Sequence, residues 1–261
     1  SSRLFLSEML DHPGRTFQLA FQVGLRAHRD LMDGIILKAG VTGDEAAQLC
    51  RLGLANYFAG AVMMPYERFL NAAEKLRYDI EILSRRFGAS FEQVCHRFTT
   101  LQRPGSRGIP FFFLRVDRAG NISKRFSSSG FHFARFGGTC PRWNVHEAFR
   151  TPGKIVTQIL QMEDGTTYFS VSRTVARVSG GYHIPEQQLA IGMGCEINHA
   201  HRLVYADGLD LTDTMCVTPI GVNCRMCERV DCNQRAFPPL NRRISITDNY
   251  RRLVPFSFAE L

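Results

Sequence analysis

Apolar residues in the first hundred positions recur at intervals of three and four, which is typical of amphipathic helices. This pattern predicts one helix in each of residues 7–25, 46–64 and 69–87. Ser90 followed by Gln93 has the spacing of a capping box, in which two side chains satisfy the first backbone N–H groups of a helix. The N-terminal part of the chain is therefore expected to be helical.

The pattern changes after residues 102–105, where Gln-Arg-Pro-Gly interrupts the helical spacing. Strands are predicted beyond this break because aromatic and β-branched residues then dominate short runs bounded by turn residues. The expected strands are residues 109–116, 122–126, 131–136, 167–175 and 189–193, with helices near 145–149 and 196–205. We therefore predict an α+β chain: a helical domain at 1–103, an α/β sensory domain at 104–222, and a cysteine-rich segment at 223–261.

Composition narrows the class of protein. Hydrophobic residues make up 44% of the chain, which is enough for a sizeable core, and no apolar run is long enough to cross a membrane. Nothing resembles an export signal either, and no membrane contact is expected. A cytoplasmic location is expected because the reduced thiolates of a cysteine-ligated centre must survive. The net charge of +8 suits an anionic partner such as nucleic acid or a phosphorylated ligand, although a merely basic protein would show the same value. Because the first residue is Ser1 and not Met, we expect a fragment.

Cysteine spacing carries the strongest local signal among the eight cysteines. Cys224 and Cys227 form a C-x2-C pair, and Cys232 follows after four intervening residues. Three close cysteines with one remote ligand are typical of a 4Fe-4S cluster, whereas zinc more often takes two pairs. Cys195 is our first choice for the remote ligand, followed by Cys140 and then His199. A structural zinc, a redox-active pair and inert thiols remain the alternatives.

The helical part resembles the ImmA/IrrE metallopeptidase family. The resemblance rests on residues 19–25, 54–65, 78–81 and 90–92. In active members a His-Glu-x-x-His motif binds zinc, and its histidines would fall at Phe21 and Leu25, its general base at Gln22, and a third ligand near Leu54. None of these side chains can bind zinc or act as a base at neutral pH. The resemblance therefore implies a pseudo-peptidase frame without catalytic residues, and we expect no enzyme activity.

The distal part is similar to the short-chain fatty acyl-CoA regulator family. The motifs that carry this similarity are residues 111–121, 123–125, 130–133, 138–144, 194–196, 199–205 and 224–229. Membership implies a regulator of acetate, propionate, glyoxylate or methylcitrate metabolism that binds acyl-CoA. It also implies promoter binding through an N-terminal helix-turn-helix domain absent from this chain, and a homo-oligomer with two DNA-binding heads.

An acyl-CoA ligand needs cationic donors for its phosphates and an apolar slot for its acyl tail. The slot is expected at the former zinc position, lined by Phe21, Leu54 and Phe58, with Leu25 beside them. Arg97, on what we expect to be the exposed face of its helix, is the leading polar contact, which the family resemblance supports. The secondary candidates are His96, Arg103, Arg107 and Lys124, while Trp143 is expected in the core.

Two other functions compete with the sensor. Residues 79–91 have the pattern of a helix-turn-helix, so the chain itself could bind DNA and hold a structural zinc. Against this, the first residue of the would-be recognition helix is Phe91. An enzyme is the third hypothesis, either a peptidase, which the missing ligands disfavour, or a redox protein with a pocket beside the cysteines.

Overall fold

The computed structural model describes residues 3–135, 137–177 and 180–245, together with residues 254, 256 and 258. Contacts between residues divide the chain into two units, Ser1–Leu101 with Val178–Glu186 and Gln102–Arg177 with Gln187–Leu261. Among the described residues, no helix is both long and apolar enough to cross a bilayer. Each unit is described by itself, unit 1 first.

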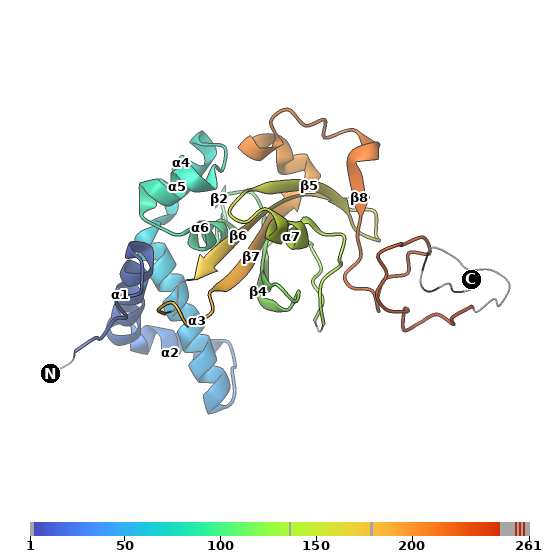
Figure 1. Ribbon diagram of the computed structural model, residues 1–261. Helices are drawn as coiled ribbons and strands as arrows, with labels where there is room; N and C mark the ends of the chain where they lie inside the picture. The colour runs from blue at the N-terminus through green and yellow to red at the C-terminus, as the bar shows by residue number, and fades with distance from the viewer. Residues whose placement is uncertain are drawn as a thin grey trace. The chain divides into compact units, whose positions relative to one another are not determined.

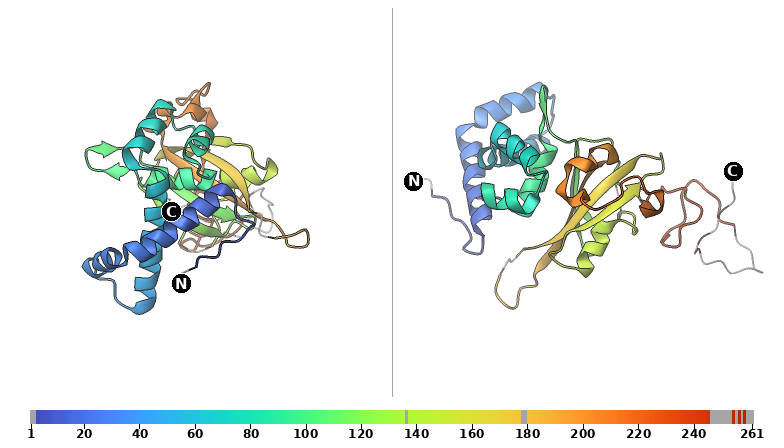
Figure 2. Two further views of the ribbon diagram at one scale, coloured as in Figure 1. Left: turned by 90° about the vertical axis from the view of Figure 1, so that its left-hand side faces the viewer. Right: turned by 90° about the horizontal axis from the view of Figure 1, so that it is seen from above.

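Unit 1 is built from helices, as the spacing of its apolar residues predicts (Figure 1). They are α1 (His12–Ala27), α2 (Arg29–Lys38), α3 (Asp44–Met63), α4 (Tyr66–Lys75), α5 (Ile80–Phe87) and α6 (Phe91–Thr99). The two long helices α1 and α3 pack against each other, with α2 between them in the chain (Figure 2). Their close approach requires Gly24, because a Cβ there would lie 2.7 Å from the ring of Phe58. The sequence pattern did not reveal α2.

The prediction of one helix over residues 69–87 is wrong, because the chain breaks between α4 and α5. Arg77 and Tyr78 adopt positive φ values of 50° and 60°, which a continuous helix does not allow. The break buries the whole Tyr78 side chain, whose hydroxyl donates a hydrogen bond of 2.6 Å to Oε1 of Glu74. Asp79 then starts α5 by accepting a hydrogen bond from the backbone N–H of Ile82. Burial of an aromatic ring thus outweighs the local helical spacing.

The predicted capping box is confirmed. Ser90 Oγ accepts from the backbone N–H of Gln93, and the Gln93 side chain accepts from the N–H of Ser90. Gly88 ends α5 in the left-handed conformation with φ 59°, which costs glycine nothing. These two local signals place the α5–α6 turn.

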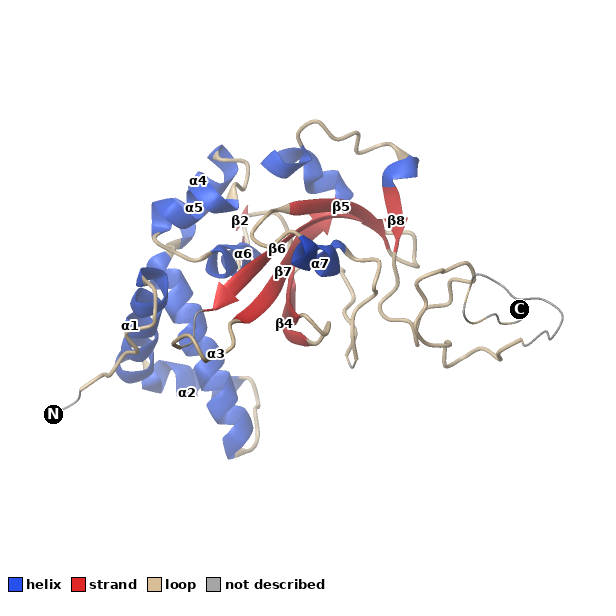
Figure 3. Cartoon of the chain, viewed as in Figure 1, coloured by secondary structure: helices blue, strands red, loops and turns tan. Residues whose placement is uncertain are grey.

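Unit 2 is organised around a six-stranded sheet with the order β4-β3-β7-β6-β5-β8 (Figures 1 and 3). The strands are β3 (Phe112–Asp117), β4 (Ile122–Ser127), β5 (Val156–Gln161), β6 (Thr167–Arg177), β7 (Gln187–Glu196) and β8 (Val217–Pro219). Neighbouring strands are antiparallel except β5 and β8, which pair in parallel. A separate two-stranded sheet joins β1 (Gln102–Arg103) and β2 (Ser106–Arg107). The helical unit followed by a sheet unit confirms the α+β class.

Two predictions for unit 2 fail in detail. Residues 131–135 form no strand, and Phe136 lies outside the described residues. Phe131 is nevertheless 5% exposed and packs its ring 4.2 Å from that of Phe112, so its apolar character reflects core packing and not strand pairing. Residues 196–205 form 3-10 helices, η2 (Ile197–Arg202) and η3 (Val204–Ala206), where an α-helix was expected.

The core of unit 2 contains a buried polar network beside its apolar side chains. Trp143 is 3% exposed, as expected, and its indole N–H donates to Ser170 Oγ at 3.1 Å. Asn144, the first residue of the short helix α7 (Asn144–Glu147), accepts hydrogen bonds from the hydroxyls of Ser170 and Ser172. Its amide donates to the backbone carbonyl of Val156 at 3.0 Å. The network anchors the segment before α7 to strands β5 and β6.

Candidate functional site

The three clustered cysteines lie in the loop that follows β8 (Figure 3). Cys227 and Cys232 are buried and Cys224 is partly buried. A turn at Asn223 shapes the C-x2-C pair, because its backbone carbonyl accepts from the N–H of Cys227 at 3.0 Å and its side chain accepts from the N–H of Met226. The backbone N–H of Ala236 points at the sulfur of Cys224 over 3.4 Å. Such N–H to sulfur contacts stabilise thiolates in metal-binding loops.

Cys140 lies next to this loop although it is more than eighty residues away in sequence. Burial raises the pKa of its thiol, hydrogen bonds from the backbone N–H groups of Gly221 and Arg142 lower it, and the neighbouring charges of Cys224 and Cys232 raise it. Gly221 also contacts Cys227, since a Cβ at this glycine would lie 2.7 Å from the Cys227 sulfur. The structure therefore brings Cys140 into the neighbourhood of all three loop cysteines.

Cys195, our first choice for the remote ligand, lies elsewhere. It is in β7, directly opposite Phe169 of β6, and its side chain is fully buried in the sheet. Burial raises the pKa of its thiol to about 12, while Arg202 and Glu196 make smaller opposite contributions. Its surroundings thus favour a neutral thiol in the core. Among the described residues, the charges that act on it are those of Arg202 and Glu196, not those of the loop cysteines. His199, the third choice, lies in η2 near Arg202, Glu196 and His201.

The Cys140 thiol lies close enough to Cys224 and Cys232 for their charges to act on it, and Gly221 links it to Cys227. Among the residues that the structure describes, no group of three or more His, Cys, Asp or Glu side chains is arranged to hold a metal ion. The donor set itself fits a metal centre, because four cysteines match the ligand number of both zinc and a cubane cluster. The kind and number of side chains thus suit a metal, whereas their arrangement in this structure is not that of a metal-binding group.

Arg235 holds the cysteine loop together from inside. Its side chain is 3% exposed, and its guanidinium donates to the backbone carbonyls of Cys224 at 2.9 Å and Cys227 at 3.1 Å. It also donates to the carbonyl of Arg229. A loop without helix or strand keeps its shape in this way, because a buried arginine supplies donors that the backbone cannot supply to itself.

In unit 1, the positions that correspond to the zinc motif of the metallopeptidases lie on α1 and α3. Phe21, Gln22 and Leu25 in α1 and Leu54 in α3 are all partly buried. Phe58, one turn after Leu54, packs against Gly24 and lies 5.0 Å from the ring of His28. The side chains at these motif positions thus have no acid–base or zinc-binding function.

The expectation that Arg97 lies on an exposed face is wrong. Its side chain is 3% exposed, its Nε donates to the backbone carbonyl of Met64 at 3.0 Å, and its Nη1 donates to Thr100 Oγ1. Its guanidinium lies 5.7 Å from the ring centroid of Tyr57 and 5.8 Å from that of Tyr66. The buried Arg97 thus stabilises the C-terminal end of α3, because it donates to the carbonyl of Met64, the residue that follows the last helical one.

The secondary candidates for acyl-CoA contacts are scattered. His96 is partly buried in α6, whereas Arg103 and Arg107 are exposed on β1 and β2. Lys124, in β4, places its ammonium 5.6 Å from the ring centroid of Phe113. The structure does not gather these four side chains with Arg97 inside either unit, and they stay individual predictions.

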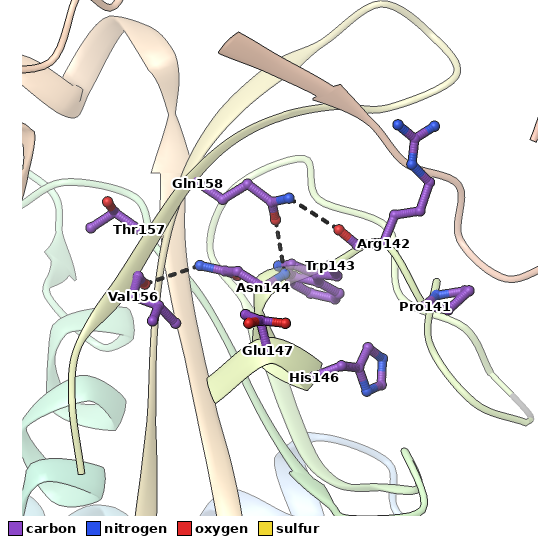
Figure 4. Close-up of a pocket in the computed structure, with 9 residues that line it drawn as sticks. All are labelled: Pro141, Arg142, Trp143, Asn144, His146, Glu147, Val156, Thr157 and Gln158. Carbon is purple, nitrogen blue, oxygen red and sulfur yellow. Dashed lines mark hydrogen bonds between the residues drawn. The ribbon is translucent and has the colours of Figure 1, made fainter. Parts of the chain in front are cut away.

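A cavity lies in each unit among the described residues. One of about 540 Å³ in unit 1 is lined by Val62, Met63, Pro65, Arg68, Asn71, Ala72, Arg86 and Phe87. One of about 530 Å³ in unit 2 is lined by residues that directly follow Cys140, with the anchoring contacts of Asn144 and Gln158 visible in Figure 4. Neither cavity includes a residue that the sequence predicts to contact acyl-CoA.

The helix-turn-helix hypothesis predicts the two helices correctly, but the expected recognition helix is not exposed. Helices α5 and α6 do follow each other across a short turn, yet none of the nine residues of α6 is exposed. Phe98 of α6 packs 5.1 Å from Tyr78 and 5.5 Å from Phe69, ring centroid to ring centroid. A helix that reads DNA must present side chains to the groove, so α6 is better described as part of the core.

Sequence reasoning missed Arg235, Gly221 and Asn144. Only nearness in sequence could have pointed to the first two, since Arg235 follows Cys232 by three positions and Gly221 precedes Cys224 by three. Asn144 ends one of the motifs that carry the family similarity, but its role as an anchor becomes visible only when its partners on β5 and β6 are known.

Known proteins resemble the chain along both units. Residues 100–256 match the family described as "Short-chain fatty acyl coenzyme A regulator, C-terminal", and residues 1–99 match the "IrrE N-terminal-like domain". The HTH-type transcriptional regulator PrpR of Mycobacterium tuberculosis is 51% identical over 249 residues, which are 95% of this chain and 51% of that protein. The propionyl-CoA carboxylase regulator of Cereibacter sphaeroides is 48% identical over 98% of this chain and 55% of its own length.

Two further comparisons agree with these. The HTH-type transcriptional regulator RamB of Mycobacterium tuberculosis is 47% identical over the whole chain and 56% of its own length. A solved structure described as a Mycobacterium tuberculosis transcriptional regulator superposes with a TM-score of 0.92 at 50% identity, covering 96% of this chain and 76% of that one. The chain spans about half the length of the curated relatives it matches.

Proposed function

Because the chain belongs to the short-chain fatty acyl coenzyme A regulator family, we propose that it is the sensing portion of a transcriptional regulator of short-chain acyl-CoA metabolism. The observation that carries this proposal is that the family match covers residues 100–256 while the relatives are all named as regulators. Promoter binding is assigned to a helix-turn-helix domain outside this chain, in a cytoplasmic homo-oligomer. The absence of zinc ligands and a base at Phe21, Gln22, Leu25 and Leu54 supports a role without catalysis.

The acyl tail is proposed to bind in unit 1 between α1 and α3. Phe21, Leu54 and Phe58 are partly buried, so they offer apolar surface that is not fully covered by the unit's own packing. Arg97 would act there indirectly, by fixing the end of α3 through Met64. The polar contacts to the CoA moiety remain predictions for His96, Arg103, Arg107 and Lys124.

A matched pair of variants tests the acyl slot. Leu54→Ala is expected to weaken the binding of propionyl-CoA about tenfold, because burial of a leucine side chain contributes about 1.5–3 kcal/mol. Leu49→Ala, on the same helix but 69% exposed, should leave the affinity unchanged. Isothermal titration with propionyl-CoA and with CoA lacking an acyl group measures both. Equal losses in the two variants, or no binding to the unaltered chain, would contradict the assignment.

The second part of the proposal is a cysteine-ligated 4Fe-4S cluster, with zinc as the alternative. We assign Cys224, Cys227 and Cys232 as three ligands and replace Cys195 by Cys140 as the fourth, since Cys140 neighbours the loop through Gly221. A bound cluster would supply sensitivity to oxidants or to iron supply, and the four cysteines would hold it.

Replacing each candidate for the fourth ligand tests this assignment. Protein purified without oxygen is assayed for iron, sulfide and zinc, and its visible spectrum is recorded. Cys140→Ser should lose the bound metal, whereas Cys195→Ser, an equally conservative change of a buried thiol, should retain it. Retention by Cys140→Ser would return the assignment to Cys195 or His199, and a colourless protein with zinc would make the centre structural.

A further inference from the structure

Arg235 carries a charge that no carboxylate balances in the described part of the chain. Its guanidinium donates only to backbone carbonyls, those of Cys224, Cys227, Arg229 and Phe237. Its Nε is buried and has no hydrogen-bond partner among the described residues. The guanidinium also lies 5.0 Å from the ring centroid of Phe258. Backbone dipoles and one aromatic ring repay only part of the desolvation of a buried cation, so burial stays costly unless an anion lies close by.

The neighbouring ionisable groups include the loop cysteines and Glu163, whose Oε2 would lie 3.3 Å from a Cβ at Gly221, next to Cys227. Arg235 binds the carbonyls of two loop cysteines and follows the third, Cys232, by three residues. Four thiolates around a doubly positive metal core leave about two net negative charges. The counter-charge for such a centre would therefore be Arg235.

We infer that Arg235 is the charge-balancing residue of the cysteine centre, holding the loop by its carbonyl contacts and stabilising the bound metal by its charge. This inference rests on the proposed metal function of Cys140, Cys224, Cys227 and Cys232. Arginine suits both tasks, because its planar fork reaches several carbonyls at once and its charge persists at any physiological pH. If Arg235 only held the loop in shape, its hydrogen-bond donors would suffice and its positive charge would not matter.

Arg225 is the natural control. It lies in the same loop and carries the same charge, but it is exposed and stacks over the ring of Phe237 at 4.7 Å. In the part of the chain that the structure describes, its side chain makes no hydrogen bond to the carbonyl of a cysteine. Its charge is screened by solvent and should contribute little to the centre.

The test compares Arg235→Gln, Arg235→Lys and Arg225→Gln with the unaltered chain after purification without oxygen. The measurements are metal and sulfide content, the rate of iron release to a chelator, and the midpoint potential. Arg235→Gln should release iron at least about tenfold faster and be harder to reduce, because reduction adds negative charge where a positive charge was removed. Arg235→Lys should keep a potential close to that of the unaltered chain, and Arg225→Gln should match it in every measurement.

Several outcomes overturn the inference. If Arg235→Gln is unchanged, or if Arg235→Lys behaves like Arg235→Gln, the charge of Arg235 does not stabilise the centre. Should Arg235→Gln fail to fold, as reported by the fluorescence of Trp143, the decision falls to Arg235→Lys: metal retention supports the inference and metal loss rejects it. If the chain holds zinc, the rate of zinc transfer to a chelator is measured in place of iron release, and Arg235→Gln is again expected to be the fastest of the variants. An unaltered chain with neither metal would overturn the proposed centre itself.

Discussion

The two units solve the same problem, holding a site in shape, by different means. In unit 1 the positions that correspond to a metallopeptidase zinc motif lie on two long helices whose packing is apolar, with Gly24 and Phe58 in contact. In unit 2 the cysteines lie in loops, and polar side chains such as Asn144 and Arg235 fix the backbone around them. Helices held by apolar packing keep their fold without zinc-binding side chains. A loop held by buried polar groups keeps its conformation only while every hydrogen-bond partner is present.

The largest effect on unit 1 should come from its aromatic core. Phe98→Ala removes a fully buried ring that packs on Phe69 and Tyr78, so the free energy of unfolding should fall by about 3–5 kcal/mol. Leu37→Ala, at a position that is 81% exposed, should change it by less than about 0.5 kcal/mol. Urea unfolding followed by far-ultraviolet circular dichroism measures both. A small loss for Phe98→Ala would show that packing does not hold this unit.

In unit 2 the comparable position is polar. Asn144→Ala leaves the hydroxyls of Ser170 and Ser172 and the carbonyl of Val156 without their partner, which should cost about 3 kcal/mol. Trp143 is the only tryptophan of the chain, so its fluorescence reports this unit during unfolding. Asn144→Ala should lower the urea midpoint of the fluorescence transition more than the midpoint of the helical circular dichroism signal of unit 1. Equal shifts of both signals would mean that the units unfold together.

A smaller and more local effect is expected at the contact between the cysteines. A methyl group at Gly221 would lie 2.7 Å from the sulfur and 2.8 Å from the Cβ of Cys227, so Gly221→Ala should destabilise the loop by about 1–3 kcal/mol and reduce bound metal. Gly153→Ala is no suitable control because φ there is 77°. Gly34→Ala, in α2 with open space around it, serves instead. Full metal content in Gly221→Ala would argue against a centre that includes Cys227.

The smallest effect concerns a helix end. Ser90→Ala removes one half of the capping box and should lower the free energy of unfolding by about 1 kcal/mol. Ser84→Ala is the matched control on the preceding helix, because the Ser84 hydroxyl is buried without a hydrogen-bond partner among the described residues. That change should be neutral or stabilising. Thermal unfolding of both variants measures the difference, and a loss in Ser84→Ala equal to that in Ser90→Ala would contradict this account.

Local signals in the sequence predicted much of the fold. The helices near α1 and α3, the capping box at Ser90, the hairpin of β3 and β4, and the C-x2-C pair all depend on residues close together in the chain. That Phe21 and Leu25 cannot bind zinc could be predicted in the same way, because the zinc motif consists of residues close together in the chain. The family resemblance also followed from such motifs, and the match over residues 100–256 confirms it.

Only the tertiary structure decided the rest. It broke the predicted helix at Tyr78, buried Arg97 against Met64, and placed Cys140 beside the loop while Cys195 stayed in the sheet. Each of these outcomes depends on which distant segments pack together, and spacing along the chain carries no information about that. Periodicity and motifs thus determined the elements and the kind of chemistry, and burial and long-range contacts determined which residues share a site.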